Sequence, residues 1–324
     1  MKIAILDDYQ NVVKELNCYS LLDGLDTTIY TDTPDSFEAL VSRLSDKDAV
    51  VLIRERTEIK PELLARLPQL KLISQTGKIS NHIDLASCNK HRVAVAEGIG
   101  SPIAPSELCW SLILASSRHI VPYVDNFHQG SWQSSGSLGL GRTLDKLTLG
   151  IWGYGKIGRR IARYGNVFGM KVLIWGSEES RENALTDGFE VASSKQDFFA
   201  QSDVLTLHLR LSSKTEACVT YDDLQLMKTD ALFVNTSRAH LIEANALVRS
   251  LEAGRPGFAA LDVYDSEPAT LKQEPLLAMP NVLCAPHLGY VESNNYELYF
   301  NIAFENLVKY FQGQPQNIVN AEIL

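Results

Sequence analysis

Short apolar runs alternate with amphipathic segments along the first hundred residues. Five runs rich in aliphatic and β-branched residues read as strands, and they begin near residues 2, 27, 49, 70 and 92. Helical patterns lie between them, such as 61 to 67, where Pro61 suits a helix start and Pro68 follows its end. Such alternation predicts a parallel sheet covered by helices on both faces.

A second series of the same kind begins after residue 145. Its predicted strands lie at 147 to 152, 170 to 175, 204 to 208, 231 to 235, 258 to 262 and 282 to 284. Helical patterns include 156 to 168, 242 to 253 and 293 to 312. The fold class is therefore predicted to be α/β, with two doubly wound parallel-sheet domains.

An apolar helix-like stretch at 105 to 120 and a glycine-rich polar loop at 130 to 142 separate the two series. The loop reads either as a surface arm or subunit contact, or as a flexible linker.

A glycine-rich turn follows the first strand of the second series. Gly153, Gly155 and Gly158 form the pattern GxGxxG between an apolar strand and an amphipathic helix. In this context the pattern predicts a dinucleotide site, in which the N–H groups of the helix start, at Lys156 and Ile157, face the pyrophosphate.

The end of the next strand is where an Asp or Glu would select NAD through the ribose 2′-hydroxyl. This chain has Gly176 there, followed by Ser177 and Glu178. Glu178 could take the ribose role and repel a 2′-phosphate, whereas Ser177 with Arg181 could receive that phosphate. The prediction is NAD, with NADP as the alternative.

Three polar residues follow the later strands, and the carboxyl ends of parallel strands share one edge of the sheet. Arg238, Glu267 and His287 each come after one of these strands, so they are predicted to meet near the cofactor. His208 ends another strand on the same edge and is a rival histidine. No acidic residue follows His208 as a partner, so it is expected to pack against backbone.

Composition narrows the classes of function. The 324 residues exceed what one core usually serves, and the net charge of -9 lacks any basic block that would suit nucleic acid or an anionic membrane. No apolar stretch approaches the roughly 20 residues of a membrane span, and the first ten residues are no secretory signal. A cytoplasmic protein with a small-molecule partner is expected.

Five scattered cysteines without a CxxC pair suit reduced thiols. His82, Cys88 and His91 form only a weak metal pattern, so no metal site is predicted.

Several motifs resemble those of the D-isomer-specific 2-hydroxyacid dehydrogenases. They are LPQLKLISQTG from 67, GYGKIG from 153, NTSRAHLIEANAL from 235, ALDVYDSEP from 260 and APHLGY from 285, and the similarity covers nearly the whole chain. The resemblance implies a smaller, flavodoxin-like substrate domain, residues 1–99 plus 288–324. It also implies an inserted NAD(P)-binding Rossmann domain, residues 100–287, with the active site in the cleft between the two.

The resemblance also implies roles. Arg238 would bind the substrate's carboxylate and carbonyl, His287 would exchange the proton, and Glu267 would pair with His287. The cofactor would contact Thr236 and Asp262, the latter at the nicotinamide carboxamide. The other substrate contacts implied are Arg54, Gly77, Lys78 and Ile79. Two features depart from the family: Gly176 replaces a frequent Asp, and TGKISNHID is an unusual form of the substrate loop.

The implied activity is hydride transfer between a nicotinamide cofactor and a small D-2-hydroxy or 2-oxo acid, with His287 as general acid and base. Two alternatives stand beside it: a corepressor-like sensor of the dinucleotide without turnover, and a phosphite-type dehydrogenase on the same fold. Formate chemistry is disfavoured, because formate enzymes of the family carry Gln where Glu267 stands. The segment 105 to 120 and the loop after it suit a homodimer.

Overall fold

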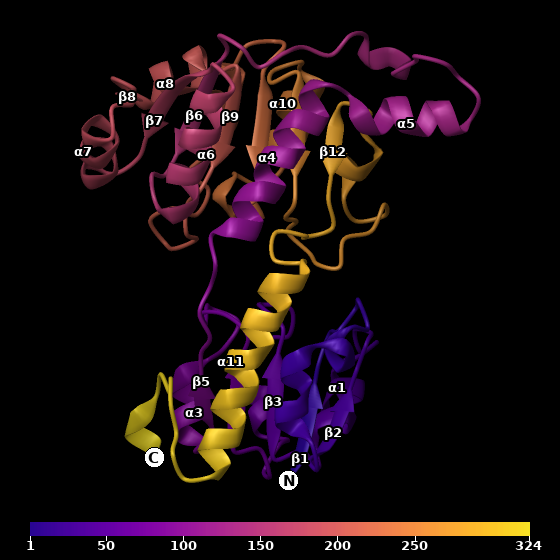
Figure 1. Cartoon of the computed structure of the whole chain (residues 1–324), viewed down its shortest axis with the longest axis vertical. Coiled ribbons are helices and arrows are strands. Elements are labelled where there is room, and N and C mark those ends of the chain that lie inside the picture. The colour runs from indigo at the N-terminus through magenta and orange to yellow at the C-terminus, as the bar shows by residue number, and fades with distance from the viewer. The chain divides into compact units, whose positions relative to one another are not determined.

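The computed structural model describes all residues, 1–324. The chain divides into two compact units, the first formed by Met1–Ser101 with Glu292–Leu324 and the second by Pro102–Val291. Both chain ends belong to the first unit (Figure 1). No helix combines the length and apolar character that crossing a bilayer requires.

Unit 1 is built on a five-stranded parallel sheet. Its strands are β1 (Lys2–Ile5), β2 (Asp26–Ile29), β3 (Ala49–Leu52), β4 (Leu72–Gln75) and β5 (Ala94–Ala96). They lie in the order β2-β1-β3-β4-β5, which is the flavodoxin-like order. All four residues of β3 are buried, as expected for a central strand covered on both faces.

Four helices accompany this sheet: α1 (Phe37–Leu44), α2 (Pro61–Leu64), α3 (Leu85–Lys90) and α11 (Ser293–Phe311). The last of these comes from the far end of the chain and packs against β3 and β4. The hydroxyl of Ser74 in β4 donates to the carbonyl of Ala303 in α11 at 2.8 Å, which ties the two segments together.

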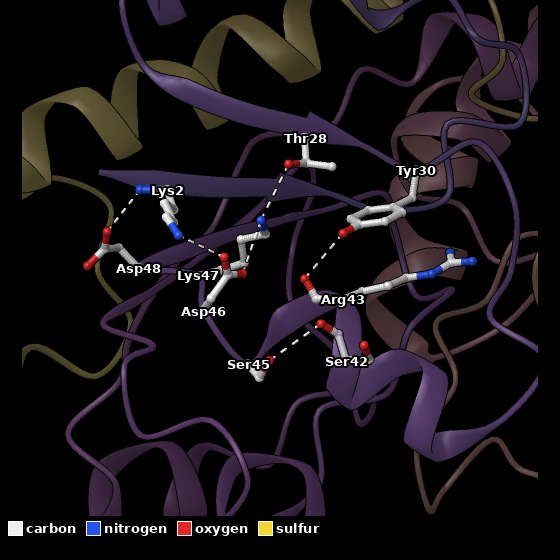
Figure 2. A network of polar contacts seen from close by, with 9 residues as sticks. All are labelled: Lys2, Thr28, Tyr30, Ser42, Arg43, Ser45, Asp46, Lys47 and Asp48. Atoms are coloured by element: carbon white, nitrogen blue, oxygen red, sulfur yellow. Dashed lines mark hydrogen bonds and ion pairs between the residues drawn. The ribbon is translucent and has the colours of Figure 1, made fainter.

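A network of polar contacts includes Lys2, at the amino end of β1, and Asp46 and Asp48, which precede β3 (Figure 2). The ammonium of Lys2 lies 3.0 Å from Asp46, and the Lys2 backbone N–H donates to Asp48 at 2.9 Å. The side chains of Lys2 and Asp46 are both 49% exposed, so this ion pair contributes little to stability.

Unit 2 is built on a seven-stranded parallel sheet. Its strands are β6 (Thr148–Trp152), β7 (Lys171–Trp175), β8 (Glu190–Val191), β9 (Val204–Leu207), β10 (Leu232–Asn235), β11 (Phe258–Leu261) and β12 (Val282–Cys284). The order is β12-β11-β10-β9-β6-β7-β8, so the strand order reverses at β6. Ligands bind at such a switch point in doubly wound sheets.

Both faces of the unit 2 sheet are buried. Leu232 and Val234 of β10 pack in one apolar cluster, with residues of α4 and α6, and Phe233 between them packs in the opposite cluster, with residues of α8, α9 and α10. The helices of the unit are α4 (Ile103–Ser117), α5 (Ile120–His128), α6 (Lys156–Val167), α7 (Glu178–Thr186), α8 (Lys195–Gln201), α9 (Tyr221–Gln225) and α10 (Ala246–Glu252). The prediction of an α/β fold with two doubly wound sheets is confirmed.

One local prediction needs correction, and one short strand was missed. The expected helix at 242 to 253 begins only at Ala246, because Asn245 has a left-handed backbone with φ of 59° and interrupts the helical turn before it. The two-residue strand β8 was not predicted, since Glu190 and Val191 are too short a run to show a period.

Candidate active site

The loops that carry the predicted site residues of unit 2 leave the sheet from a single row. Trp152, Leu207, Asn235, Leu261 and Cys284 are register partners across β6, β9, β10, β11 and β12. The glycine turn and the loops bearing His208, Arg238, Glu267 and His287 therefore start side by side at the carboxyl edge.

The imidazole of His287 is paired with the carboxylate of Glu267. Nδ1 of His287 lies 2.5 Å from Oε2 of Glu267, and both side chains are about four-fifths buried. The other oxygen, Oε1, accepts from the backbone N–H of Tyr264 at 3.1 Å, which fixes the carboxylate. The pairing at Nδ1 fixes the orientation of the ring and leaves Nε2 as the other ring nitrogen.

The loop that presents His287 is held by Asp262 at the end of β11. The two carboxylate oxygens of Asp262 accept from the N–H groups of Leu288, at 2.6 Å, and Gly289, at 2.8 Å. Burial raises the pKa of Asp262 to about 6. His287 itself has a left-handed backbone, φ 53°, a conformation that costs energy and needs such support.

Sequence reasoning missed this bracing role of Asp262, for which only a resemblance-based cofactor contact was expected. One signal could have indicated this role. An acidic residue ends one strand, and the next strand is short and is followed by a histidine. The carboxylate oxygens keep further lone pairs after accepting these two bonds, so the bracing leaves room for the cofactor contact.

Arg238 follows β10 in a turn that is cross-braced by Asn235. The Asn235 amide donates to the carbonyl of Arg238 at 2.8 Å and accepts from the N–H of Ser237 at 3.0 Å. One guanidinium nitrogen of Arg238 donates to the carbonyl of Ser237 at 2.6 Å. The turn is thus anchored to the strand, and the half-buried guanidinium stays at the sheet edge.

His208 occupies the same row with different surroundings. Its Nε2 lies 3.2 Å from the hydroxyl of Thr206, and its Nδ1 is buried without a hydrogen-bond partner. Burial lowers the pKa of His208 to about 3, so the ring is neutral at physiological pH. The contact is with a side-chain hydroxyl, and the expectation that His208 packs against backbone stays a prediction.

The glycine turn has the geometry that a bound pyrophosphate requires. Gly153 has φ of 102°, and a Cβ there would lie 2.5 Å from the carbonyl oxygen of His208. A Cβ at Gly158 would lie 2.0 Å from the carbonyl oxygen of Gly153, so strand and helix pack closely. Gly155, by contrast, faces open space within 4 Å. The packing of the protein itself does not require glycine at this position, whereas close approach of a phosphate does.

The remaining predicted cofactor residues lie around this turn. Lys156 and Ile157 are the first residues of α6, whose leading N–H groups have no partner within the helix. Thr236 follows β10 on the same row and is half-buried. Ser177 is the N-cap of α7, and Glu178 is exposed in the first turn of that helix.

The predicted substrate loop belongs to unit 1, at the carboxyl ends of β3 and β4. A Cβ at Gly77 would lie 2.0 Å from Nη1 of Arg54, so only glycine lets the guanidinium lie over the loop. The N–H of Arg54 donates to the hydroxyl of Thr76 at 3.1 Å. Glu97 forms an ion pair with Lys78 and accepts from the N–H of Ile79 at 3.4 Å.

The structure contains no group of three or more His, Cys, Asp or Glu side chains positioned to hold a metal ion. His82, Cys88 and His91 therefore do not form such a group. Burial lowers the pKa of His82 to about 4.

A doubly wound parallel sheet with a glycine turn after the strand at its switch point is the architecture of dinucleotide-binding proteins. Residues 110–289 match the family described as D-isomer specific 2-hydroxyacid dehydrogenase, NAD binding domain. A glyoxylate reductase of Aeropyrum pernix is 33% identical over 299 residues, which cover 90% of this chain and 88% of that protein.

Two solved structures extend this comparison. A phosphoglycerate oxidoreductase from Vibrio cholerae is 59% identical, with a TM-score of 0.95 over 97% of this chain and 99% of the other. D-lactate dehydrogenase from Aquifex aeolicus, in complex with NAD and lactic acid, is 26% identical, with a TM-score of 0.77 over 98% and 99% of the two chains. The chain belongs to the D-isomer-specific 2-hydroxyacid dehydrogenase family, and it is thus an oxidoreductase of 2-hydroxy acids with a nicotinamide-dinucleotide-binding domain.

Proposed function

We propose that the protein reduces small 2-oxo acids to D-2-hydroxy acids, and catalyses the reverse reaction, with His287 as general acid and base. The observation that carries this proposal is the 2.5 Å pair of His287 and Glu267 on the same sheet edge as the glycine turn. The relatives named above, a glyoxylate reductase, a phosphoglycerate oxidoreductase and a D-lactate dehydrogenase, support this substrate class.

The cofactor, when bound, would exchange a hydride with C2 of the substrate. The N–H groups at Gly155, Lys156, Ile157 and Gly158 would hold its pyrophosphate, and Thr236 and Asp262 would contact it further along the edge. Glu178 is the residue that would favour NAD, and Ser177 is the one that would favour NADP.

His287 would move the proton at Nε2, because Nδ1 is occupied by Glu267. In reduction the charged imidazole gives this proton to the substrate oxygen, and in oxidation the neutral imidazole takes it back. Glu267 acts through His287, because its contact at Nδ1 fixes the orientation of the ring. The bonds from Asp262 keep the backbone beside His287 in place during this exchange.

Arg238 would bind the substrate's carboxylate and its oxo group. Its guanidinium is planar, always charged and matched to a carboxylate, which suits an acidic protein that must hold an anion with few cations. The backbone N–H groups around Gly77, Lys78 and Ile79, with the charge of Arg54, are the further donors that we propose for the carboxylate.

A homodimer is part of the same proposal. Side chains on α5 and the loop after it are apolar and exposed, including Phe127 at 55% and Trp132 at 74%. These two rings stack edge to face, 5.5 Å between centroids. Exposed aromatic groups in one segment favour a protein contact. Replacing Trp132 with Ser should shift the sedimentation coefficient toward that of a monomer.

The five cysteines are all free, which supports the proposal that the protein works in a reducing compartment, the cytoplasm.

The decisive experiment measures oxidation of reduced cofactor with a panel of 2-oxo acids. Glyoxylate, hydroxypyruvate, pyruvate and bulkier 2-oxo acids are each tested with NADH and with NADPH. We expect turnover with at least one of them. Tight dinucleotide binding without turnover on any 2-oxo acid or on phosphite would contradict the proposal and favour a dinucleotide sensor.

A further inference from the structure

The loop after β7 lacks an acidic side chain where a carboxylate would select NAD. The strand ends at Trp175, and Gly176 and Ser177 follow. A Cβ at Gly176 would lie 3.2 Å from Cβ of Ser180, which is tighter than an ordinary contact. The first turn of α7 therefore crowds the space that a carboxylate at residue 176 would need.

A cavity of about 340 Å³ opens beside this loop. Apolar walls and polar side chains share its lining; the apolar walls include Trp152, Trp175 and Leu209, and the polar side chains are Ser177, Ser180, Lys214 and Thr215. One lining residue is a cation, and none is a carboxylate. The cavity is thus suited to an anionic group.

The hydroxyls of Ser177 and Ser180 lie together at the start of α7. Ser177 Oγ accepts from the N–H of Ser180 at 3.3 Å, and the two Oγ atoms are 3.2 Å apart. The helix has nine residues, and its N-terminal N–H groups and dipole favour an anion. These hydroxyls can donate hydrogen bonds to an oxyanion once they turn from each other.

Arg181 does not line the cavity, but it is a second cation in contact with one of its walls. Its guanidinium carbon lies 5.1 Å from the ring centroid of Trp175, which lines the cavity. Its Nε is buried and has no hydrogen-bond partner. Buried donors of this kind are usually satisfied, so a ligand that accepts from this group would complete the arrangement.

Glu178 and Glu179 place no negative charge inside the cavity that would offset Lys214 and Arg181. Both are exposed in the first turn of α7, and neither lines the cavity. The support for NAD, which came from Glu178, is therefore weaker in the folded chain than the support for the alternative with Ser177 and Arg181.

We propose that this cavity, the 2′-phosphate pocket, binds the 2′-phosphate of the adenosine ribose, and that the protein prefers NADP(H) to NAD(H). A phosphate monoester carries up to two negative charges near neutral pH, which Lys214 and Arg181 balance. The hydroxyls of Ser177 and Ser180 supply directed hydrogen bonds. The inference rests on the proposed function only in that the ligand is a nicotinamide dinucleotide.

The test uses adenosine nucleotides that lack nicotinamide. Isothermal titration of the full chain compares 2′,5′-ADP with 5′-AMP and with 3′,5′-ADP, which carries the same charge at the wrong hydroxyl. We expect 2′,5′-ADP to bind about ten- to hundredfold more tightly than either, as hydrogen bonds to a charged group do. Equal affinity for 2′,5′-ADP and 5′-AMP, or for the two ADP isomers, overturns the inference.

Single substitutions then assign the effect to the pocket. Lys214→Ala and Arg181→Ala should each weaken 2′,5′-ADP about tenfold and leave 5′-AMP unchanged, whereas Lys214→Arg should retain affinity. Lys146→Ala is the matched control, because this lysine is exposed and does not line the pocket. Equal weakening of both nucleotides by the pocket variants speaks against a phosphate-specific site.

Turnover separates this inference from the function it deepens. A protein that reduces 2-oxo acids with a higher kcat/KM for NADH than for NADPH would keep its proposed function and lose the preference for NADP(H). Tight, selective binding of 2′,5′-ADP with no turnover on any 2-oxo acid would keep the preference for NADP(H) and overturn the proposed function.

Discussion

Two histidines follow strands of unit 2 on the same row of the sheet, and their surroundings give them opposite properties. His287 after β12 has a carboxylate at 2.5 Å, and its side chain is about four-fifths buried. His208 after β9 has only the hydroxyl of Thr206 at 3.2 Å and a buried, unpartnered Nδ1. The comparison teaches that the neighbouring loop, more than the residue type, decides which histidine has a carboxylate partner.

The difference comes from what the adjacent strand contributes. β11 lies beside β12 and continues into a loop that brings both Asp262 and Glu267 to the His287 segment. The loop after β9 receives no such carboxylate, and burial keeps the His208 ring neutral.

The largest effect is expected from removing the imidazole of His287. His287→Ala should lower kcat by roughly 10² to 10⁴-fold, the usual contribution of a general acid, while dinucleotide affinity stays unchanged. His208→Asn is the matched variant and should keep kcat within about threefold, because no proton transfer at this ring is expected. Steady-state kinetics and titration with the dinucleotide measure both. A larger loss in His208→Asn than in His287→Ala would reverse the assignment.

Glu267→Gln tests the partner that distinguishes the two histidines. An amide in place of the carboxylate is a weaker, neutral acceptor and can present its NH2 group to Nδ1, so the orientation of the His287 ring should be held less well. We expect kcat to fall by about ten- to a hundredfold. Steady-state kinetics are the measurement, with Asp265→Asn, an exposed acid two residues away, as control. An unchanged kcat would mean that Glu267 only shapes the turn.

Asp262→Asn tests the support of the His287 loop. The amide can accept from only one of the N–H groups of Leu288 and Gly289 and leaves the other unsatisfied in a buried place. The unsatisfied donor costs about 1–3 kcal/mol of stability. We expect a lower urea midpoint together with a lower kcat. A normal kcat in a destabilised variant would show that the bracing matters for folding alone.

The smallest effect concerns acid stability at the His208 site. The pKa of His208 is about 3 in the folded chain and near 6.5 when unfolded, so the unfolded chain binds a proton first as the pH falls. Its contribution to the free energy of unfolding is complete above pH 6.5 and is lost progressively toward pH 3. His208→Gln should therefore flatten the decline in stability over this range. Part of the decline in stability should remain in this variant, because His82 also has a lowered pKa, about 4. The free energy of unfolding is measured with urea at pH 7 and at pH 5. An equal decline between these two pH values in both proteins would contradict this account.

Much of the fold could be predicted because its signals are local. The buried strands show continuous apolar runs, and the six residues from Gly153 to Gly158 contain the whole GxGxxG pattern that predicts a dinucleotide site. The start of α10 could not be predicted, since the backbone of Asn245 carries no periodic signal. The residues of the candidate site were named from their places after strands, and the resemblance to the family implied that Glu267 pairs with His287.

By itself the sequence determined two parallel sheets, a dinucleotide turn, and the three polar residues Arg238, Glu267 and His287 on one edge. Only the tertiary structure decided that Nδ1 of His287 meets Glu267 and that Asp262 holds the backbone beside it. It also decided that the cavity after β7 is lined by Lys214 and not by Glu178. The physical reason is that these contacts join segments far apart in the chain, and their distances depend on strand order and loop path, which no local pattern encodes.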